Sequence, residues 1–185
     1  MDTNDKTNNK KWYVVYRNSL RTLNANKPLT TKSLLDESKI TYFIPIMRRH
    51  KWVGDELIET EEELLRNLLF VQTEEDINAL IARTDALKAP LIDCSTNLPA
   101  MVPDEEMACF MKLLSHNSEW GGVKILQSPF SSFIHHKKVA VTDGPFAGIE
   151  GYIVRIRRDR KLVISLCQLS VAISGIPHSF IKEIP

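Results

Sequence analysis

The sequence predicts an α+β protein in two parts, a mixed N-terminal part followed by a small all-β barrel. Up to about residue 115, short runs rich in β-branched and aromatic residues alternate with stretches that have helical spacing. From residue 139 onwards, apolar residues recur at every second position in short segments separated by turn or charged residues. Several short strands within about 50 residues are typical of a small β-barrel.

The N-terminal part contains two predicted strands and two predicted helices. The strands cover residues 12–16 and 40–44, which are rich in β-branched and aromatic side chains. Residues 48–63 are highly charged and contain a Gly-Asp pair, which predicts an exposed loop or hairpin. Residues 73–81 combine a polar N-cap sequence with one apolar face, and residues 103–114 place apolar side chains at helical spacing after a proline and three acids.

Composition and charge exclude several classes of protein. The formal net charge is +1, so no general attraction to nucleic acid or to an anionic membrane is expected, although residues 55–63 hold six acids. No apolar run approaches the roughly 20 residues that a membrane span needs. The polar N-terminus does not resemble a signal peptide, and the three cysteines lack metal-site spacing, so we expect a cytoplasmic protein without cofactor, metal or membrane contact.

A glycine-rich turn marks the start of the barrel. Residues 144–151 hold three of the chain's seven glycines together with Pro145. Proline suits a tight turn, and we expect Gly144 and Gly148 to supply positive φ or room for a close backbone approach. The turn is therefore predicted to present Phe146 while the flanking strands stay paired. A strand, the basic loop 157–161 and another strand follow.

This arrangement resembles the KOW motif, an SH3-like barrel that ends NusG-type transcription factors and also occurs in ribosomal proteins. The strand at 12–16, the Phe-Ile-Pro at the end of the second strand and the helix after Pro103 resemble the N-terminal (NGN) domain of the same factors. The resemblance implies an NGN-type α/β sandwich with an antiparallel sheet over residues 10–115, a linker over 116–134 and a KOW barrel over 135–185. The linker is apolar enough that parts of it are expected to pack.

Residues 64–72 give conflicting signals. Leu64, Leu65, Leu68 and Leu69 have helical spacing. However, residues 65–71 (LRNLLFV) are similar in position to a family strand of the pattern F-P-G/N-Y-L-F-V, and Asn67 is similar to the specialised paralogue RfaH. We therefore predict a strand over 67–72, against the local periodicity.

The resemblance implies binding rather than catalysis, and no catalytic residue is predicted. NusG-type proteins place an apolar face of the NGN sheet on the clamp helices of the RNA polymerase β′ subunit. By resemblance, the polymerase-contacting residues are Tyr16, Leu65, Leu68 and Phe70. Leucines replace the family's aromatic residues at 65 and 68, and arginine replaces its proline at 66. The alternative for Tyr16 and Phe70 is a role in the core, where strand aromatics usually lie.

Further contacts follow from the same resemblance. Phe146 is similar to a family phenylalanine that meets the partner of the KOW barrel, a ribosomal protein or Rho, and its alternative role is to plug the barrel. Cys167 stands where the family often has a second exposed phenylalanine. Basic side chains are candidates for nucleic-acid contact, with a solvated surface as the alternative. They are Arg17 and Arg21 for the non-template DNA strand, and Arg157, Arg158 and Arg160 for RNA.

The predicted function is that of a non-enzymatic, monomeric transcription elongation or antitermination factor that suppresses pausing or termination. The departures at residues 65–68 and 167 point to a specialised paralogue of RfaH or UpxY type, acting at particular operons such as polysaccharide loci. A ribosome- or RNA-associated KOW protein acting in translation is the alternative. RfaH also shows that such a C-terminal sequence can support a helical state, but the alternation over 139–173 favours a β-barrel.

Overall fold

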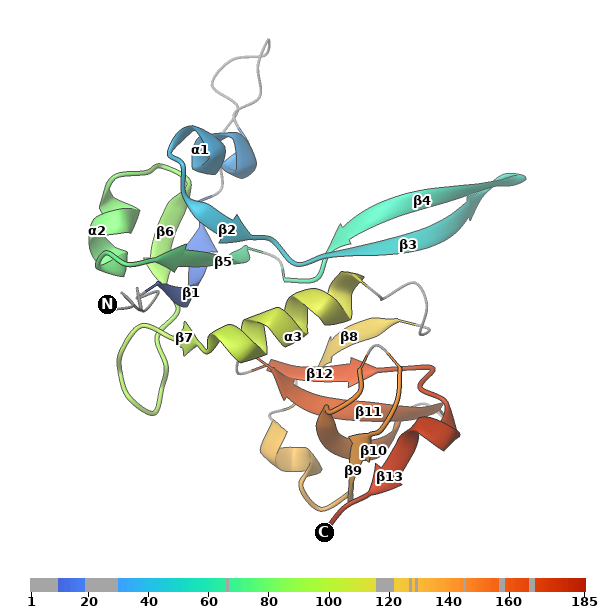
Figure 1. Ribbon diagram of the computed structural model, residues 1–185. Helices are drawn as coiled ribbons and strands as arrows, with labels where there is room; N and C mark the ends of the chain where they lie inside the picture. The colour runs from blue at the N-terminus through green and yellow to red at the C-terminus, as the bar shows by residue number, and fades with distance from the viewer. Residues whose placement is uncertain are drawn as a thin grey trace, which may run out of the picture. The chain divides into compact units, whose positions relative to one another are not determined.

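A computed structural model describes residues 10–18, 30–65, 67–115, 122–126, 128, 130–144, 146–156, 159–166 and 169–185. Within these residues the chain combines helices with antiparallel sheets, which confirms the predicted fold class (Figure 1). The chain divides into two compact units, one formed by residues 1–44 and 65–104 and the other by residues 45–64 and 105–185. This division groups residues 45–64 and 105–115 with the C-terminal part, whereas the sequence predicted one N-terminal domain over residues 10–115.

The first unit is built on a five-stranded antiparallel sheet. Its strand order is β2-β5-β1-β6, and β7 also pairs with β1. The strands are β1 (Lys11–Arg17), β2 (Thr41–Phe43), β5 (Leu68–Thr73), β6 (Leu87–Pro90) and β7 (Met101–Val102). The strand predicted over residues 67–72 is therefore confirmed, and the helical interpretation of that segment is wrong.

Two short helices cover one face of this sheet. They are α1 (Thr31–Glu37) and α2 (Ile77–Ala82), and Leu35 of α1 packs in one core with Ile77 of α2 and with Val15 and Val71 of the strands. Both helices begin with a side-chain cap. Thr30 forms a capping box with Ser33, and Asp76 accepts hydrogen bonds from the first turn of α2. The cap predicted within residues 73–76 is thus Asp76.

The second unit begins with a hairpin formed by β3 (Ile46–Val53) and β4 (Glu56–Glu63), shown as a long two-stranded ribbon in Figure 1. This outcome confirms the hairpin expected from the charged segment. Seven of the eight residues of β4 are exposed, and Arg48 lies 3.7 Å from both Glu59 and Glu61. Helix α3 (Asp104–Ser115) follows Pro103 as predicted and buries the apolar stripe Met107, Phe110, Leu113 and Leu114.

A six-stranded antiparallel sheet forms the C-terminal barrel. Its order is β13-β9-β10-β11-β12-β8. The elements are β8 (Val123–Leu126), the 3-10 helix η1 (Phe130–Phe133), β9 (Lys137–Val141), β10 (Glu150–Ile156), β11 (Asp159–Leu166), β12 (Leu169–Ile173), the 3-10 helix η2 (His178–Phe180) and β13 (Ile181–Glu183). The predicted linker over 116–134 needs correction, because β8 pairs with β12 and belongs to the sheet.

Both faces of this sheet are apolar. The face that carries Val139, Leu162 and Ile173, here called the inner face, is closed by the curvature of the sheet, and these three side chains are buried. On the opposite, outer face, a buried cluster of Val154, Val163 and Ala172 packs against further apolar side chains, which include Leu126, Phe130 and Phe133. Part of the predicted linker therefore covers the outside of the barrel.

The glycine-rich turn serves two geometric purposes. Gly148 has a φ of +89° and donates its N–H to the carbonyl oxygen of Val141 at 2.7 Å, as expected for a glycine that supplies positive φ. Gly151 instead allows a close approach, because a Cβ placed there would lie 2.4 Å from the carbonyl oxygen of Val163. Phe146, which precedes Gly148 in the same turn, is buried and only 2% exposed.

Replacing Gly151 with alanine is expected to destabilise the barrel by about 1–3 kcal/mol, since the added methyl group overlaps backbone of β11 that cannot move aside without straining the ladder. Urea denaturation and amide exchange of β10 and β11 measure the loss. Gly54→Asn is the control, because Gly54 has open space around it and a φ of +63° that asparagine tolerates. Equal effects of the two substitutions would contradict the close-approach explanation.

A hydrogen bond from the Tyr42 hydroxyl to Asp36 Oδ1 (2.8 Å) joins β2 to α1. Burial, together with this bond and the charge of Asp36, raises the pKa of Tyr42 from 10.0 to about 12. The folded state therefore holds the proton more tightly than the unfolded state, and its stabilisation is complete below pH 10 and lost as the pH rises towards 12. Urea denaturation across this range should show that the stability advantage of the wild type over Tyr42→Phe decreases; a constant difference would contradict the assignment.

Candidate functional site

The second face of the first unit's sheet carries an apolar row that α1 and α2 do not cover. Because side chains alternate along a strand, Trp12, Val14 and Tyr16 of β1 point to the face opposite the helical core. In the register of the sheet, Val14 lies opposite Phe70 and Tyr16 lies opposite Leu68. These four positions therefore form two adjacent cross-strand apolar pairs on one face.

Exposure increases along this row. Val14 and Phe70 are 4% and 0% exposed, whereas Tyr16 is 39% exposed and Leu68 is half-buried. Phe43 of β2, also half-buried, lies opposite Phe70, and the two ring centroids are 6.3 Å apart. We call Tyr16, Leu68 and Phe43 the Tyr16 patch. It is an accessible apolar surface beside the buried pair Val14 and Phe70.

The backbone at Asn67 positions one end of this patch. Asn67 has a φ of +64°, in the left-handed region that asparagine tolerates better than other side chains except glycine. Its carbonyl oxygen accepts the backbone N–H of Arg17 at 2.9 Å, just before β5 begins at Leu68. This bond extends the pairing of β1 with β5 and holds Leu68 opposite Tyr16.

The four residues predicted to contact polymerase thus occupy different environments. Tyr16 and Leu68 are accessible in the patch, Phe70 is buried beside it, and Leu65 is only 9% exposed. The sequence could place them on one sheet, but burial of each side chain depends on packing that local pattern does not encode. An accessible surface at this site is formed by Tyr16, Leu68 and Phe43, and sequence reasoning missed the last of these.

The other predicted site residues are not part of the Tyr16 patch, and some of them lie outside the described residues. Phe146 is buried in the barrel, the position expected for a plug. Arg17 is half-buried at the end of β1, and Arg160 is exposed at the start of β11. Four of the predicted residues, Arg21, Arg157, Arg158 and Cys167, lie outside the part that the structure describes.

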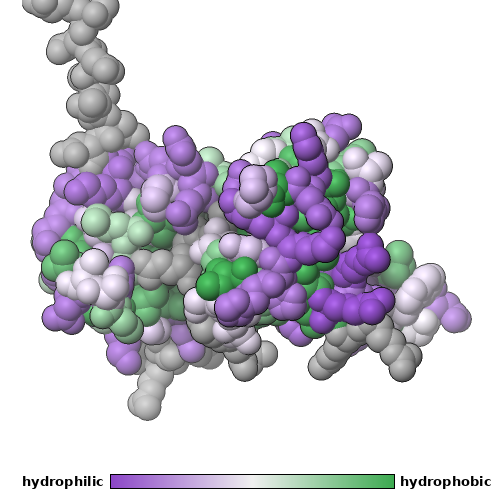
Figure 2. Space-filling view, turned by 90° about the horizontal axis from the view of Figure 1, so that it is seen from below, coloured by the Kyte–Doolittle hydropathy of each residue, from purple (hydrophilic) through white to green (hydrophobic). Residues whose placement is uncertain are grey.

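Sequence reasoning also missed exposed apolar side chains at the tip of the β3–β4 hairpin. Trp52 is 66% exposed, and Leu57, directly opposite it, is 53% exposed. Apolar residues flanking the Gly-Asp turn were the available signal. On the face of the molecule shown in Figure 2, hydrophilic residues predominate and apolar residues form small separate clusters.

Three features of the described residues concern metal ligands, nucleophiles and membrane-spanning helices. Nowhere among them do three His, Cys, Asp or Glu side chains gather as metal ligands would. Burial is the main cause that raises the pKa of the Cys109 thiol, which keeps it protonated and poorly nucleophilic at neutral pH. No helix in the described ranges has the length and apolar character needed to cross a bilayer.

Comparisons with known proteins place these observations in a family. Residues 10–111, more than half of the chain, match the family model of NusG, described as transcription termination factor NusG. A comparison with curated proteins gave no match. Among solved structures, one described as "Domain interaction in Thermotoga maritima NusG" is similar, with 17% identity and a TM-score of 0.49 over 95% of this chain and 98% of that one.

Replacing Asn67 with alanine is expected to destabilise the first unit by about 1–2 kcal/mol, because alanine disfavours the left-handed backbone at this position. Asn67→Gly should have a smaller effect, since glycine adopts positive φ without steric strain. Urea denaturation of the two variants and the wild type provides the comparison. If glycine and alanine destabilised equally, the backbone conformation would not be the reason for asparagine here.

Proposed function

The chain belongs to the NusG family of transcription factors, and on that premise we propose that it binds RNA polymerase through the Tyr16 patch of its first unit. The family consists of non-enzymatic transcription elongation and antitermination factors, and its members bind RNA polymerase. The observation that supports the proposal is an aromatic side chain, 39% exposed, beside half-buried Leu68 on the sheet face opposite the helical core.

The construction of the patch suits a protein interface. A few aromatic and aliphatic side chains commonly supply most of the energy of such an interface, and they work best when little ordering is needed on binding. Val14 and Phe70 are buried next to the patch and hold that side of it in one arrangement. Tyr16 adds a hydroxyl group that can remain hydrated at the rim while its ring is buried by a partner.

The proposed partner surface is the pair of clamp helices of the polymerase β′ subunit, which is the surface that the resemblance to NusG-type proteins implies. A factor that bridges the nucleic-acid cleft stabilises the active arrangement of the polymerase only if it binds that arrangement more tightly than the paused one. The function proposed for this chain is therefore suppression of pausing or termination through differential binding.

We further propose a specialised role of RfaH or UpxY type at particular operons, such as polysaccharide loci. Support comes from residues 65–68, where leucine stands at both aromatic positions of the family pattern and arginine stands at its proline position. These changes among the side chains expected to contact polymerase favour a modified polymerase contact. Asn67 carries less weight in this choice, because glycine and asparagine both satisfy its left-handed backbone.

Truncating Tyr16 to alanine is expected to weaken binding to purified RNA polymerase by about 5- to 30-fold, which corresponds to the ~1–2 kcal/mol of one aromatic anchor. Leu98→Ala is the matched control, because Leu98 is 58% exposed and lies in a loop outside the sheet. Affinity is measured by biolayer interferometry with the full chain, and function by a pause and termination assay with the same polymerase.

The proposal predicts that Tyr16→Ala lowers read-through in parallel with affinity, whereas Leu98→Ala behaves as the wild type. Absence of polymerase binding by the folded wild-type chain would end the proposal. Normal affinity combined with lost read-through would place the functional contact elsewhere on the chain.

A further inference from the structure

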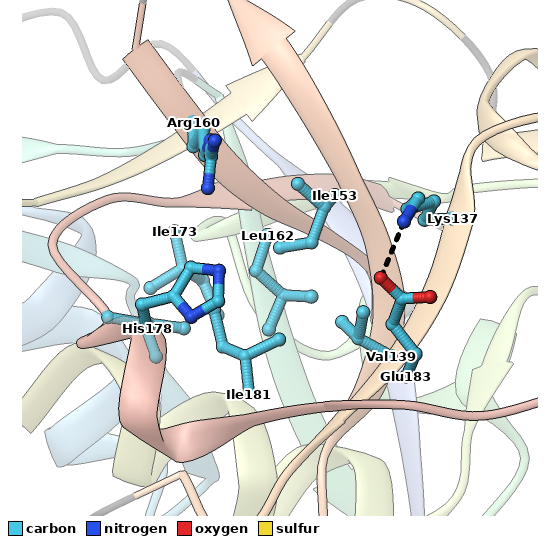
Figure 3. Close-up of a pocket in the computed structure, with 10 residues that line it drawn as sticks. Lys137, Val139, Ile153, Arg160, Leu162, Ile173, His178, Ile181 and Glu183 are labelled. Carbon is cyan, nitrogen blue, oxygen red and sulfur yellow. Dashed lines mark hydrogen bonds and ion pairs between the residues drawn. The ribbon is translucent and has the colours of Figure 1, made fainter.

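The two ends of the C-terminal barrel are filled differently. At the end where β9 finishes and β10 starts, Phe146 is buried and occupies the interior. The opposite end, where β9 starts, holds a cavity of about 550 Å³ (Figure 3). Ligand pockets in proteins typically have volumes of about 300–1,000 Å³, so this hollow can accept one or two large side chains.

The cavity has an apolar floor and a charged mouth. Its aliphatic lining comes from Val139, Ile153, Leu162, Ile173, Ile176 and Ile181. At the mouth, Lys137 Nζ and Glu183 Oε1 are 2.6 Å apart in an ion pair that closes one side, as Figure 3 shows. Arg160 and His178 stand on other parts of the rim. A ligand for this site needs an apolar group for the floor and polar groups for the rim.

The rim carries an uncompensated positive charge. Arg160 lies directly opposite Arg155 in the pairing of β10 with β11, and both side chains are exposed. Alternation places both on the inner face, in line with Leu162 and Ile153. Neither arginine forms an ion pair with another residue in the described part of the chain. Like charges directly opposite in a ladder are destabilising, and an anionic partner would relieve that repulsion.

The lining favours a protein segment over RNA as the occupant. Proteins that hold single-stranded nucleic acid stack its bases on aromatic rings. None of the ten described residues that line this cavity is Phe, Tyr or Trp, and its floor is formed by branched aliphatic side chains. Such a floor complements Leu, Ile or Phe of a peptide, while the arginines complement flanking carboxylates.

We propose that this open end of the barrel is a binding site for an acidic segment of a partner protein that inserts one or two bulky apolar side chains. The cavity belongs to the second unit and the Tyr16 patch to the first, so this proposal goes beyond the proposed polymerase contact. It uses the end of the barrel opposite Phe146, so a partner held here leaves the glycine-rich turn accessible.

The test uses the full chain labelled with ¹³C in its isoleucine methyl groups, since four isoleucines line the cavity. The probe is the peptide acetyl-Glu-Glu-Leu-Phe-Glu-Glu-amide, titrated by NMR. Saturable shifts are expected for Ile153, Ile173, Ile176 and Ile181 but not for Ile77, which lies in the core of the first unit. Peptides with Ser-Ser in place of Leu-Phe, or with lysine in place of glutamate, test the apolar and charged parts separately.

Arg160→Glu should weaken peptide binding by about tenfold, because it replaces attraction at the rim with repulsion. Lys182→Glu is the matched control, since it changes the net charge equally but alternates to the other face of β13, away from the cavity. Unchanged methyl chemical shifts in the free variants show that they fold. Arg155→Glu serves as a second charge variant, because Arg155 lies directly opposite Arg160 in the pairing of β10 with β11.

Three results would overturn the proposal. The first is no shift of the cavity methyl groups, or equal shifts with the Ser-Ser peptide. The second is equal weakening by Arg160→Glu and Lys182→Glu, which would indicate attraction by overall charge. The third is a shift of the same methyl signals on addition of a short oligouridine at a lower concentration than the peptide requires, which would identify an RNA site.

Discussion

The register between β1 and β5 is the constraint on which the first unit depends. It places Val15, Leu69 and Val71 in the core beneath α1 and α2, and at the same time sends Tyr16 and Leu68 to the other face. Because side chains alternate with a period of two, a slip of one residue would exchange the two faces, exposing core residues and burying the patch. The hydrogen bond from the Arg17 N–H to Asn67 extends this pairing to the end of β1. One pairing therefore specifies both stability and the surface available to a partner.

Residues 64–72 show the limit of predicting secondary structure from local periodicity. Leu64, Leu65, Leu68 and Leu69 have the spacing of a helical face, yet β5 begins at Leu68 after a left-handed Asn67. A single left-handed residue ends any continuous helix there, and Leu69 and Val71 gain burial on the helical core that an isolated helix would not provide. The resemblance of residues 65–71 to a family strand predicted this strand correctly, whereas the periodicity of residues 64–72 did not. Strong alternation over 139–173 made the barrel strands predictable from local pattern alone.

Other features of the site depend on contacts between residues far apart in the sequence. The sequence shows that residues 123–133 are apolar, but it does not show where they pack, since β8 pairs with β12 some 45 residues later. Sequence reasoning left two roles for Phe146, and only the closed barrel shows the side chain inside. Graded exposure from Phe70 to Tyr16 likewise arises from packing around a sheet whose residue types look alike in sequence. Residue type and spacing thus predict which side chains share a face, whereas the depth of each requires the assembled fold.

Burial on both faces of the barrel sheet also bears on which secondary structure its sequence supports. Leu162, Val163 and Ile164 are consecutive in β11 and all three are buried, as are Val171, Ala172 and Ile173 in β12. A strand can bury consecutive side chains because they point to opposite faces, each with its own cover. A surface helix formed from the same residues buries one stripe and leaves the others in water. Such a helix would also release Leu126, Phe130 and Phe133 from the outer cluster, so the segment that covers the barrel stabilises the β form directly.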